Sequence, residues 1–94
     1  MKYVIVHEAK EPHQENLAKA LEIEKERGKR RKKGEKIPSM KMITPFYITL
    51  DTPWKSFWVV DCEPEDILHW SRDYGDFFNA KVYPVVTREE WEKI

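Results

Sequence analysis

Two segments of this chain have apolar residues at successive positions, so that both faces of an extended backbone would be apolar. Residues 3–8 read YVIVHE and residues 56–60 read SFWVV. Runs of this length and β-branched or aromatic content are typical of strands in the interior of a sheet. The pattern therefore predicts interior strands over residues 3–8 and 54–61.

Two further strand-like segments, 40–50 and 80–86, each contain a proline, Pro45 and Pro84. Proline cannot donate a hydrogen bond to a neighbouring strand, so in sheets it is confined to edge strands, strand starts and bulges. We therefore expect these two segments to form the edges of a four-stranded sheet.

Helical periodicity separates the strands. Residues 12–27 and 64–74 each begin with a proline beside acidic residues and end before a glycine, Gly28 or Gly75, which are typical helix boundaries. Residues 87–90 read TREE, a capping-box pattern for a last helical turn.

The predicted element order is β-α-β-β-α-β, the split βαβ unit of ferredoxin-like α+β folds. Right-handed crossovers then give an antiparallel sheet with strand order 4-1-3-2 and both helices on one face. The proline-containing strands take the two edges in that order. We expect one domain over residues 1–94.

The sheet face without helices is expected to be apolar, because the interior strands have no polar face. A monomer would then expose a patch larger than soluble monomers usually show. Two copies packed face to face around a two-fold axis would cover it, so the sequence predicts a homodimer. The residues expected on this face are Tyr3, Ile5, Trp58, Val60 and Tyr83.

The segments MKYVIVHE, FWVVD and HWSRDYGDFFNAKVYPVV resemble the uncharacterised domain of unknown function 3303 family, within the dimeric α+β barrel superfamily. The resemblance covers nearly the whole chain and is strongest over residues 54–86. It departs at residues 29–36, where the family has a shorter, less basic link. It implies a ferredoxin-like fold and a homodimer whose sheets enclose a lumen, and it implies no established activity.

Composition favours a cytoplasmic protein. Charged residues make up 36% of the chain and amides are few, a bias that resembles thermophile usage. The single Cys62 excludes an internal disulfide, fits a reducing compartment and is expected to have a packing role. The N-terminal run is too short for a signal peptide, and no apolar run approaches the roughly 20 residues that cross a bilayer.

The sequence predicts no membrane partner, no cofactor and no metal site. His13 and His69 are expected on helix faces that point away from a common site.

Five residues form the ligand site that we expect in the dimer lumen: Tyr3, His7, Tyr47, Trp58 and Tyr83. They would line a pocket with apolar walls and few hydroxyl groups, or they would fill the dimer core. His7 is the one acid–base candidate, because histidine titrates near neutrality; its alternative is a structural histidine near a strand end. An enzyme built on this site would resemble a cofactor-independent oxygenase or isomerase.

The strongest charge feature is a basic run made of Lys29, Arg30, Arg31, Lys32, Lys33 and Lys36. Its like charges repel, so we expect a mobile loop over residues 29–36. Such a run can contact the phosphates of a nucleic acid or an acidic partner. Two observations argue against a nucleic-acid partner: the run lacks interleaved aromatic residues for base stacking, and the formal net charge of the chain is zero.

The sequence thus leaves three functions open. The first is a homodimer that binds a small apolar or aromatic ligand in its lumen. The second is an interaction module that uses residues 29–36, and the third is a structural dimer whose core is filled. Whether the protein is an enzyme stays undecided at this point.

Overall fold

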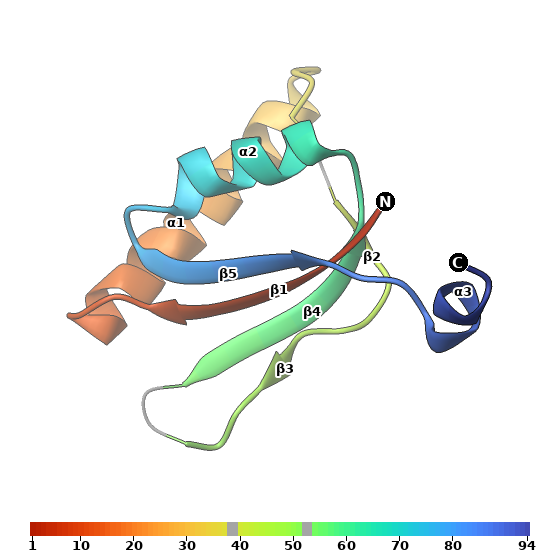
Figure 1. Ribbon diagram of the computed structural model, residues 1–94. Helices are drawn as coiled ribbons and strands as arrows, with labels where there is room; N and C mark the ends of the chain where they lie inside the picture. The colour runs from red at the N-terminus through yellow and green to blue at the C-terminus, as the bar shows by residue number, and fades with distance from the viewer. Residues whose placement is uncertain (38–39, 52–53) are drawn as a thin grey trace.

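The computed structural model describes residues 1–37, 40–51 and 54–94, and over these residues the chain forms an antiparallel sheet with three helices (Figure 1). The α+β class predicted from the sequence is confirmed. In chain order the elements are β1 (Lys2–Ala9), α1 (His13–Lys32), β2 (Lys41–Met42), β3 (Tyr47–Ile48), β4 (Lys55–Asp61), α2 (Pro64–Tyr74), β5 (Phe78–Pro84) and α3 (Arg88–Glu92).

The sheet has five strands among the described residues, not four. Its order is β2-β4-β1-β5, and β3 lies off this path and also pairs with β4. The expected four-strand order 4-1-3-2 therefore does not describe the observed sheet. The difference arises in the segment predicted as one strand over residues 40–50, which forms two strands of two residues each.

A bulge at Thr44 and Pro45 divides this segment. The N–H groups of Ile43 and Thr44 both donate to the carbonyl oxygen of Val59, at 2.8 and 3.3 Å. The Val59 N–H in turn donates to the Thr44 hydroxyl oxygen (2.9 Å), so a side chain here replaces a backbone partner. Pro45 has no N–H to offer, and regular pairing resumes only at Tyr47. Both proline-containing segments do lie at edges of the sheet, as the proline argument predicted.

The two long helices differ in how well their ends were predicted. Helix α2 spans Pro64–Tyr74 and is followed by Gly75, as expected. Helix α1 continues through Gly28 to Lys32, and the chain turns at Gly34, whose φ of +91° favours glycine. The expectation of a mobile loop over residues 29–36 is therefore wrong for 29–32. Basic side chains in a last helical turn interact favourably with the helix dipole, which supports the longer helix.

Helices α1 and α2 lie on the same side of the sheet (Figure 1). The side chains beneath α2 include Tyr3, Ile5, Trp58 and Val60, which are buried together with Trp70 of that helix. These four sheet residues were expected on the face without helices, so the predicted assignment of faces is inverted. Both alternating sets are apolar in β1 and β4, and alternation alone does not tell which set the helices cover.

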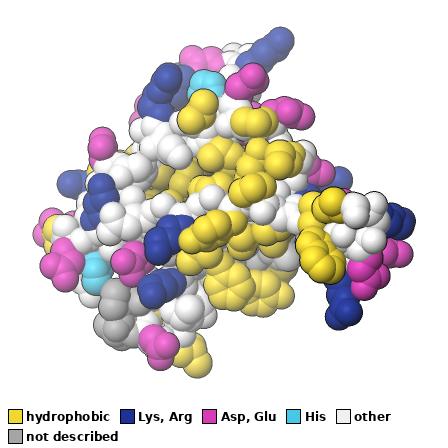
Figure 2. Space-filling model, in the orientation of Figure 1, with side chains coloured by type: hydrophobic (Ala, Val, Ile, Leu, Met, Phe, Trp, Pro, Cys, Tyr) yellow, Lys and Arg dark blue, Asp and Glu magenta, His cyan; other side chains and the backbone are white. Residues whose placement is uncertain are grey.

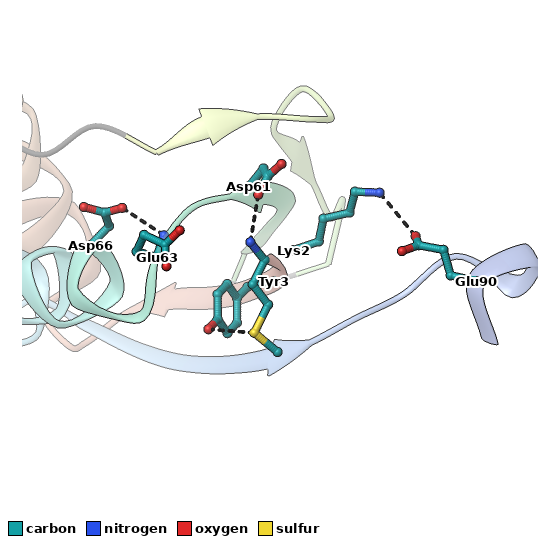
Figure 3. Close-up of polar contacts among 7 residues, drawn as sticks. Lys2, Tyr3, Asp61, Glu63, Asp66 and Glu90 are labelled. Carbon is teal, nitrogen blue, oxygen red and sulfur yellow. Dashed lines mark hydrogen bonds and ion pairs between the residues drawn. The ribbon is translucent and has the colours of Figure 1, made fainter. Parts of the chain in front are cut away.

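Polar contacts connect the helices to each other and to the sheet. Between α1 and α2, Arg27 forms an ion pair with Asp73, and its side chain is only 10% exposed. At the other end of the molecule, the N-terminal amine donates to Asp61 (3.0 Å) and the Lys2 ammonium to Glu90 (3.3 Å), which connects α3 to β1 (Figure 3). The predicted capping box of α3 is present.

Candidate ligand-binding pocket

A pocket with a cavity volume of about 430 Å³ lies where β1 ends and α1 begins, on the helix-covered side of the sheet. We call it the His7 pocket. Its apolar walls are Ala9, Leu17, Ile48, Trp54 and Phe78. Its polar lining residues are His7, His13, Gln14, Ser56 and Glu8.

Small residues flank His7 in the sheet, and one of them, Ser56, lines the pocket. Across β4, β1 and β5, the row that contains His7 has Ser56 on one side and Ala80 on the other. In the neighbouring row, Ile5 lies between Trp58 and Val82, which fill the space under α2. The small Ser56 side chain leaves space beside His7 on the β4 side, and Trp54 and residues of α1 line that space as well.

The His7 imidazole is packed among aromatic rings. Its centroid lies 5.0 Å from Trp58 in an edge-to-face arrangement, 5.9 Å from Trp70 and 4.5 Å from Phe78. Burial lowers the pKa of His7 from its ordinary value of 6.5 to about 4. The Nδ1 atom is buried and has no hydrogen-bond partner among the described residues. His7 is therefore a neutral imidazole at physiological pH.

His13 lines the same pocket from the first turn of α1, although the sequence pattern placed it on a face that points elsewhere. The connection from β1 to α1 is short, and the buried Asn16 side chain anchors it by donating to the carbonyl oxygen of Lys10 (2.8 Å). A helix that begins so soon after a strand must lie over the end of that strand. The shortness of residues 10–12 was the signal that could have identified His13.

The five residues predicted to share one site do not lie together. Tyr3, His7 and Trp58 are on the helix-covered side, where Tyr3 and Trp58 are buried in the core. Tyr47 and Tyr83 are half exposed on the opposite face of the sheet, paired in register with Phe57 and Val4. His7 and Trp58 are in contact, but Trp58 does not line the His7 pocket, and the lining residues other than His7 were not predicted.

The opposite face, which we call the helix-free face, carries its own apolar band. Register places Val4 beside Val59 and Tyr83, and Val6 beside Phe57. The ring of Tyr47 stacks on that of Phe57, with centroids 5.2 Å apart. Figure 2 shows hydrophobic side chains gathered over the strands in the middle of the view and a second hydrophobic group at α3.

Charged rows border this band at both ends. Lys2 pairs in register with Asp61 on one side, and Glu8 pairs with Lys55 on the other. An apolar centre with a charged rim is the usual anatomy of a protein–protein interface.

The basic run forms the exposed C-terminal end of α1. Lys29, Arg30, Arg31 and Lys32 are helical and Lys33 follows as the C-cap. Arg30 forms an ion pair with Glu35 (2.6 Å).

Two other candidate groups are structural. Cys62 is buried in the core, and burial raises the pKa of its thiol, so the packing role expected for it is supported. His69 is exposed on α2. Within residues 1–37, 40–51 and 54–94, no group of three or more His, Cys, Asp or Glu side chains is arranged to hold a metal ion.

A second cavity of about 210 Å³ lies between α1, α2 and β2. Phe46, Trp58 and Trp70 form part of its wall, and Glu24 and Arg27 bring charges of both signs. Since Arg27 already binds Asp73, this cavity is a weaker candidate than the His7 pocket.

In the part of the chain that the structure describes, no helix combines the length and apolar character needed to cross a bilayer. Comparison of the chain with protein-family models, with curated proteins and with solved structures finds no match.

Proposed function

We propose that this protein binds a small apolar or aromatic molecule in the His7 pocket. The observation that carries the proposal is the partly enclosed cavity of about 430 Å³, whose apolar walls surround a few hydrogen-bonding side chains. Sites for small organic molecules usually combine these two properties at about this size.

The environment of His7 favours binding over acid–base catalysis. A general base works best when its pKa lies near the working pH, whereas the pKa of His7 is lowered to about 4 by burial. At neutral pH such an imidazole accepts a proton poorly, but it can still exchange hydrogen bonds with a ligand. We therefore assign His7 to ligand recognition.

We propose further that two copies pair through their helix-free faces. Phe57, Tyr47 and Tyr83 are 39%, 51% and 50% exposed there, and the charged rows at both ends would form the rim. A homodimer is also what the resemblance to the domain of unknown function 3303 family and the dimeric α+β barrels implies. The ligand pocket proposed here differs from a shared lumen, because it lies on the helix-covered side of each sheet.

A thermal-shift screen of one- and two-ring organic molecules, followed by NMR mapping of the hits, tests the binding proposal. We expect hits to shift the amide signals of Ser56 and Leu17, which line the pocket. Ser56→Leu would fill space in the pocket and abolish binding. Ser71→Leu, the same change at an exposed position of α2, is the matched control and should bind as the parent does.

Hits that shift amide signals of the helix-free face would contradict binding in the His7 pocket. They would indicate a ligand site at the dimer interface instead. A complete absence of hits, with both variants folded, would leave a structural dimer without a ligand site. Retained binding in Ser56→Leu would equally refute the proposal.

A second candidate function rests on the basic end of α1. Lys29, Lys32 and Lys33 are exposed, and none forms an ion pair with a described residue. Such a cluster would bind a polyanion with strong salt dependence. Fluorescence anisotropy of a labelled single-stranded oligonucleotide at low and moderate salt, compared with the variant that carries Gln at all three positions, tests it; no binding at low salt excludes it.

A further inference from the structure

We propose that the His7 pocket selects an uncharged ligand that carries a hydroxyl or carbonyl group on a ring system, and that it rejects carboxylates. This inference rests on the proposed function, because it specifies the chemistry of the ligand at the same site.

The first argument is the distribution of charge. No lysine or arginine is among the described residues that line the pocket. Lys55 and Lys81, from the neighbouring strands, pair in register with Glu8 and Val6. They line an adjoining hollow that shares His7, Glu8 and Phe78 with the His7 pocket, and neither lysine lines the pocket itself. The one formally charged lining residue is Glu8, which lies in the same row of the sheet as Lys55 and offers no cation to a bound anion.

The second argument is the cost of burying an ion. Moving a carboxylate from water into an apolar cavity is strongly unfavourable unless a cation or several hydrogen-bond donors receive it. The walls that Leu17, Ile48 and Phe78 contribute offer neither. A neutral hydroxyl or carbonyl needs only one or two hydrogen bonds, and the cavity can supply these.

The third argument is the set of polar groups inside the cavity. His7, Gln14 and Ser56 are neutral side chains that can each both donate and accept a hydrogen bond. His7 and Ser56 are cross-strand neighbours on β1 and β4, and Gln14 joins them from α1. The aromatic rings of Trp54 and Phe78 supply flat apolar surfaces for a ring.

Three molecules of one shape test the selection: 2-naphthol, 2-naphthoate and 2-naphthylmethylammonium. Binding is measured by NMR titration at pH 8, where histidine side chains are ordinarily neutral and each probe has a single main charge state. We expect 2-naphthol to bind at least about tenfold more tightly than 2-naphthoate, since one unpaired buried charge costs more than the free energy of one decade in affinity.

A charge placed at the pocket by substitution provides the reciprocal test. Ile48 lines the pocket and is 62% exposed, so Ile48→Lys would bring an ammonium group to the cavity without removing a core side chain. We expect this variant to gain affinity for 2-naphthoate. Leu50→Lys, at a fully exposed site outside the pocket, is the control and should leave the preference of the parent unchanged.

The outcomes separate the two proposals. If the Ser56 and Leu17 signals show tighter binding of 2-naphthoate or of the ammonium probe, the proposal of an uncharged ligand is wrong, although the pocket itself is confirmed. Equal affinity for all three probes would overturn it as well. Failure of every probe to bind, in the parent and in Ile48→Lys, would count against the proposed function itself.

Discussion

At the scale of single residues, His7 decides how the pocket behaves. Its ring lies against three aromatic rings, and desolvation by burial is what lowers its pKa. The same burial that makes His7 a poor base makes its protonation costly for the folded protein.

We therefore expect acid to destabilise the protein through His7. The pKa of His7 is about 4 in the folded state against an ordinary value of 6.5, so the unfolded chain takes up this proton first as the pH falls. Stability is then lost progressively between pH 6.5 and about 4 and is not affected through this group above pH 6.5. Over this range the melting temperature of the parent should fall relative to that of His7→Leu as the pH falls, because the variant lacks the group that takes up the proton.

His69→Leu removes an exposed histidine of α2 and serves as the control for that measurement. Its melting temperature should follow the parent at every pH. A pH profile of His7→Leu that runs parallel to the parent would show that His7 is protonated as easily in the folded state as in the unfolded state.

At the scale of elements, polar contacts stabilise two parts of the fold that bury little apolar surface, helix α1 and the edge segment that contains β2 and β3. Helix α1 buries the polar residues Asn16 and Arg27 together with Ala20, so its attachment depends partly on hydrogen bonds and an ion pair. Strand β2 continues into β3 only through the bulge at Thr44.

Removing the carboxylate that Arg27 binds should weaken the packing of α1 on α2. We expect Asp73→Ala to lower the free energy of unfolding by about 1–3 kcal/mol, because the largely buried guanidinium loses a charged partner. Urea unfolding followed by circular dichroism measures this. Glu92→Ala, which breaks the exposed pair with Arg88, should leave the urea midpoint unchanged, and an equal effect of the two substitutions would contradict the assigned role.

The Thr44 hydroxyl should stabilise the edge of the sheet by accepting the Val59 N–H. Thr44→Val keeps the shape of the side chain but loses this acceptor, so we expect a loss of about 1 kcal/mol. Hydrogen exchange of the Val59 amide should become faster. Thr49→Val removes a similar bond from Lys55 in an exposed setting, where water can replace it, and should cost less.

At the scale of the whole molecule, the two faces of the sheet have different partners. Helices α1 and α2 cover one face, and the other presents the apolar band of Val4, Phe57 and their neighbours. We predict that a second copy covers it, so the particle in dilute solution has twice the chain mass of 11.4 kDa.

Sedimentation equilibrium of two variants checks this prediction. Phe57→Glu places a charge in the middle of the band and should yield a folded monomer. Leu68→Glu, at an exposed apolar residue of α2, should remain dimeric. A parent protein that sediments as a monomer, or a Phe57→Glu variant that stays dimeric, would disprove pairing through this face.

Much of the fold could be read from local signals. Continuous apolar runs identified β1 and β4, the prolines identified the edges of the sheet, and Pro64 with Gly75 bounded α2 to the residue. These signals work because each depends on the chemistry of a few adjacent residues. The end of α1 was missed because Gly28 lowers helix propensity without ending the helix, and the favourable basic turn after it outweighed that cost.

The site could be read far less well, since a pocket is made by residues from different elements. His7 was identified as a candidate, but its partners His13, Ser56 and Trp54 belong to α1 and to β4 or its approach. No sequence pattern relates them before the chain is folded. Tyr47 and Tyr83 were grouped with Trp58 by residue type, and the register places them on opposite faces.

The amino-acid sequence by itself determined which segments are strands and helices, the α+β class, and the presence of two apolar faces on the sheet. These properties follow from periodicity and backbone chemistry, which act over a few residues. Only the tertiary structure decided which of the two faces the helices cover, because Tyr3, Ile5 and Trp58 are as apolar as Val4, Val6 and Phe57. That choice depends on how α1 and α2 pack across the whole sheet, and with it the structure buried His7 beside a cavity instead of in a lumen.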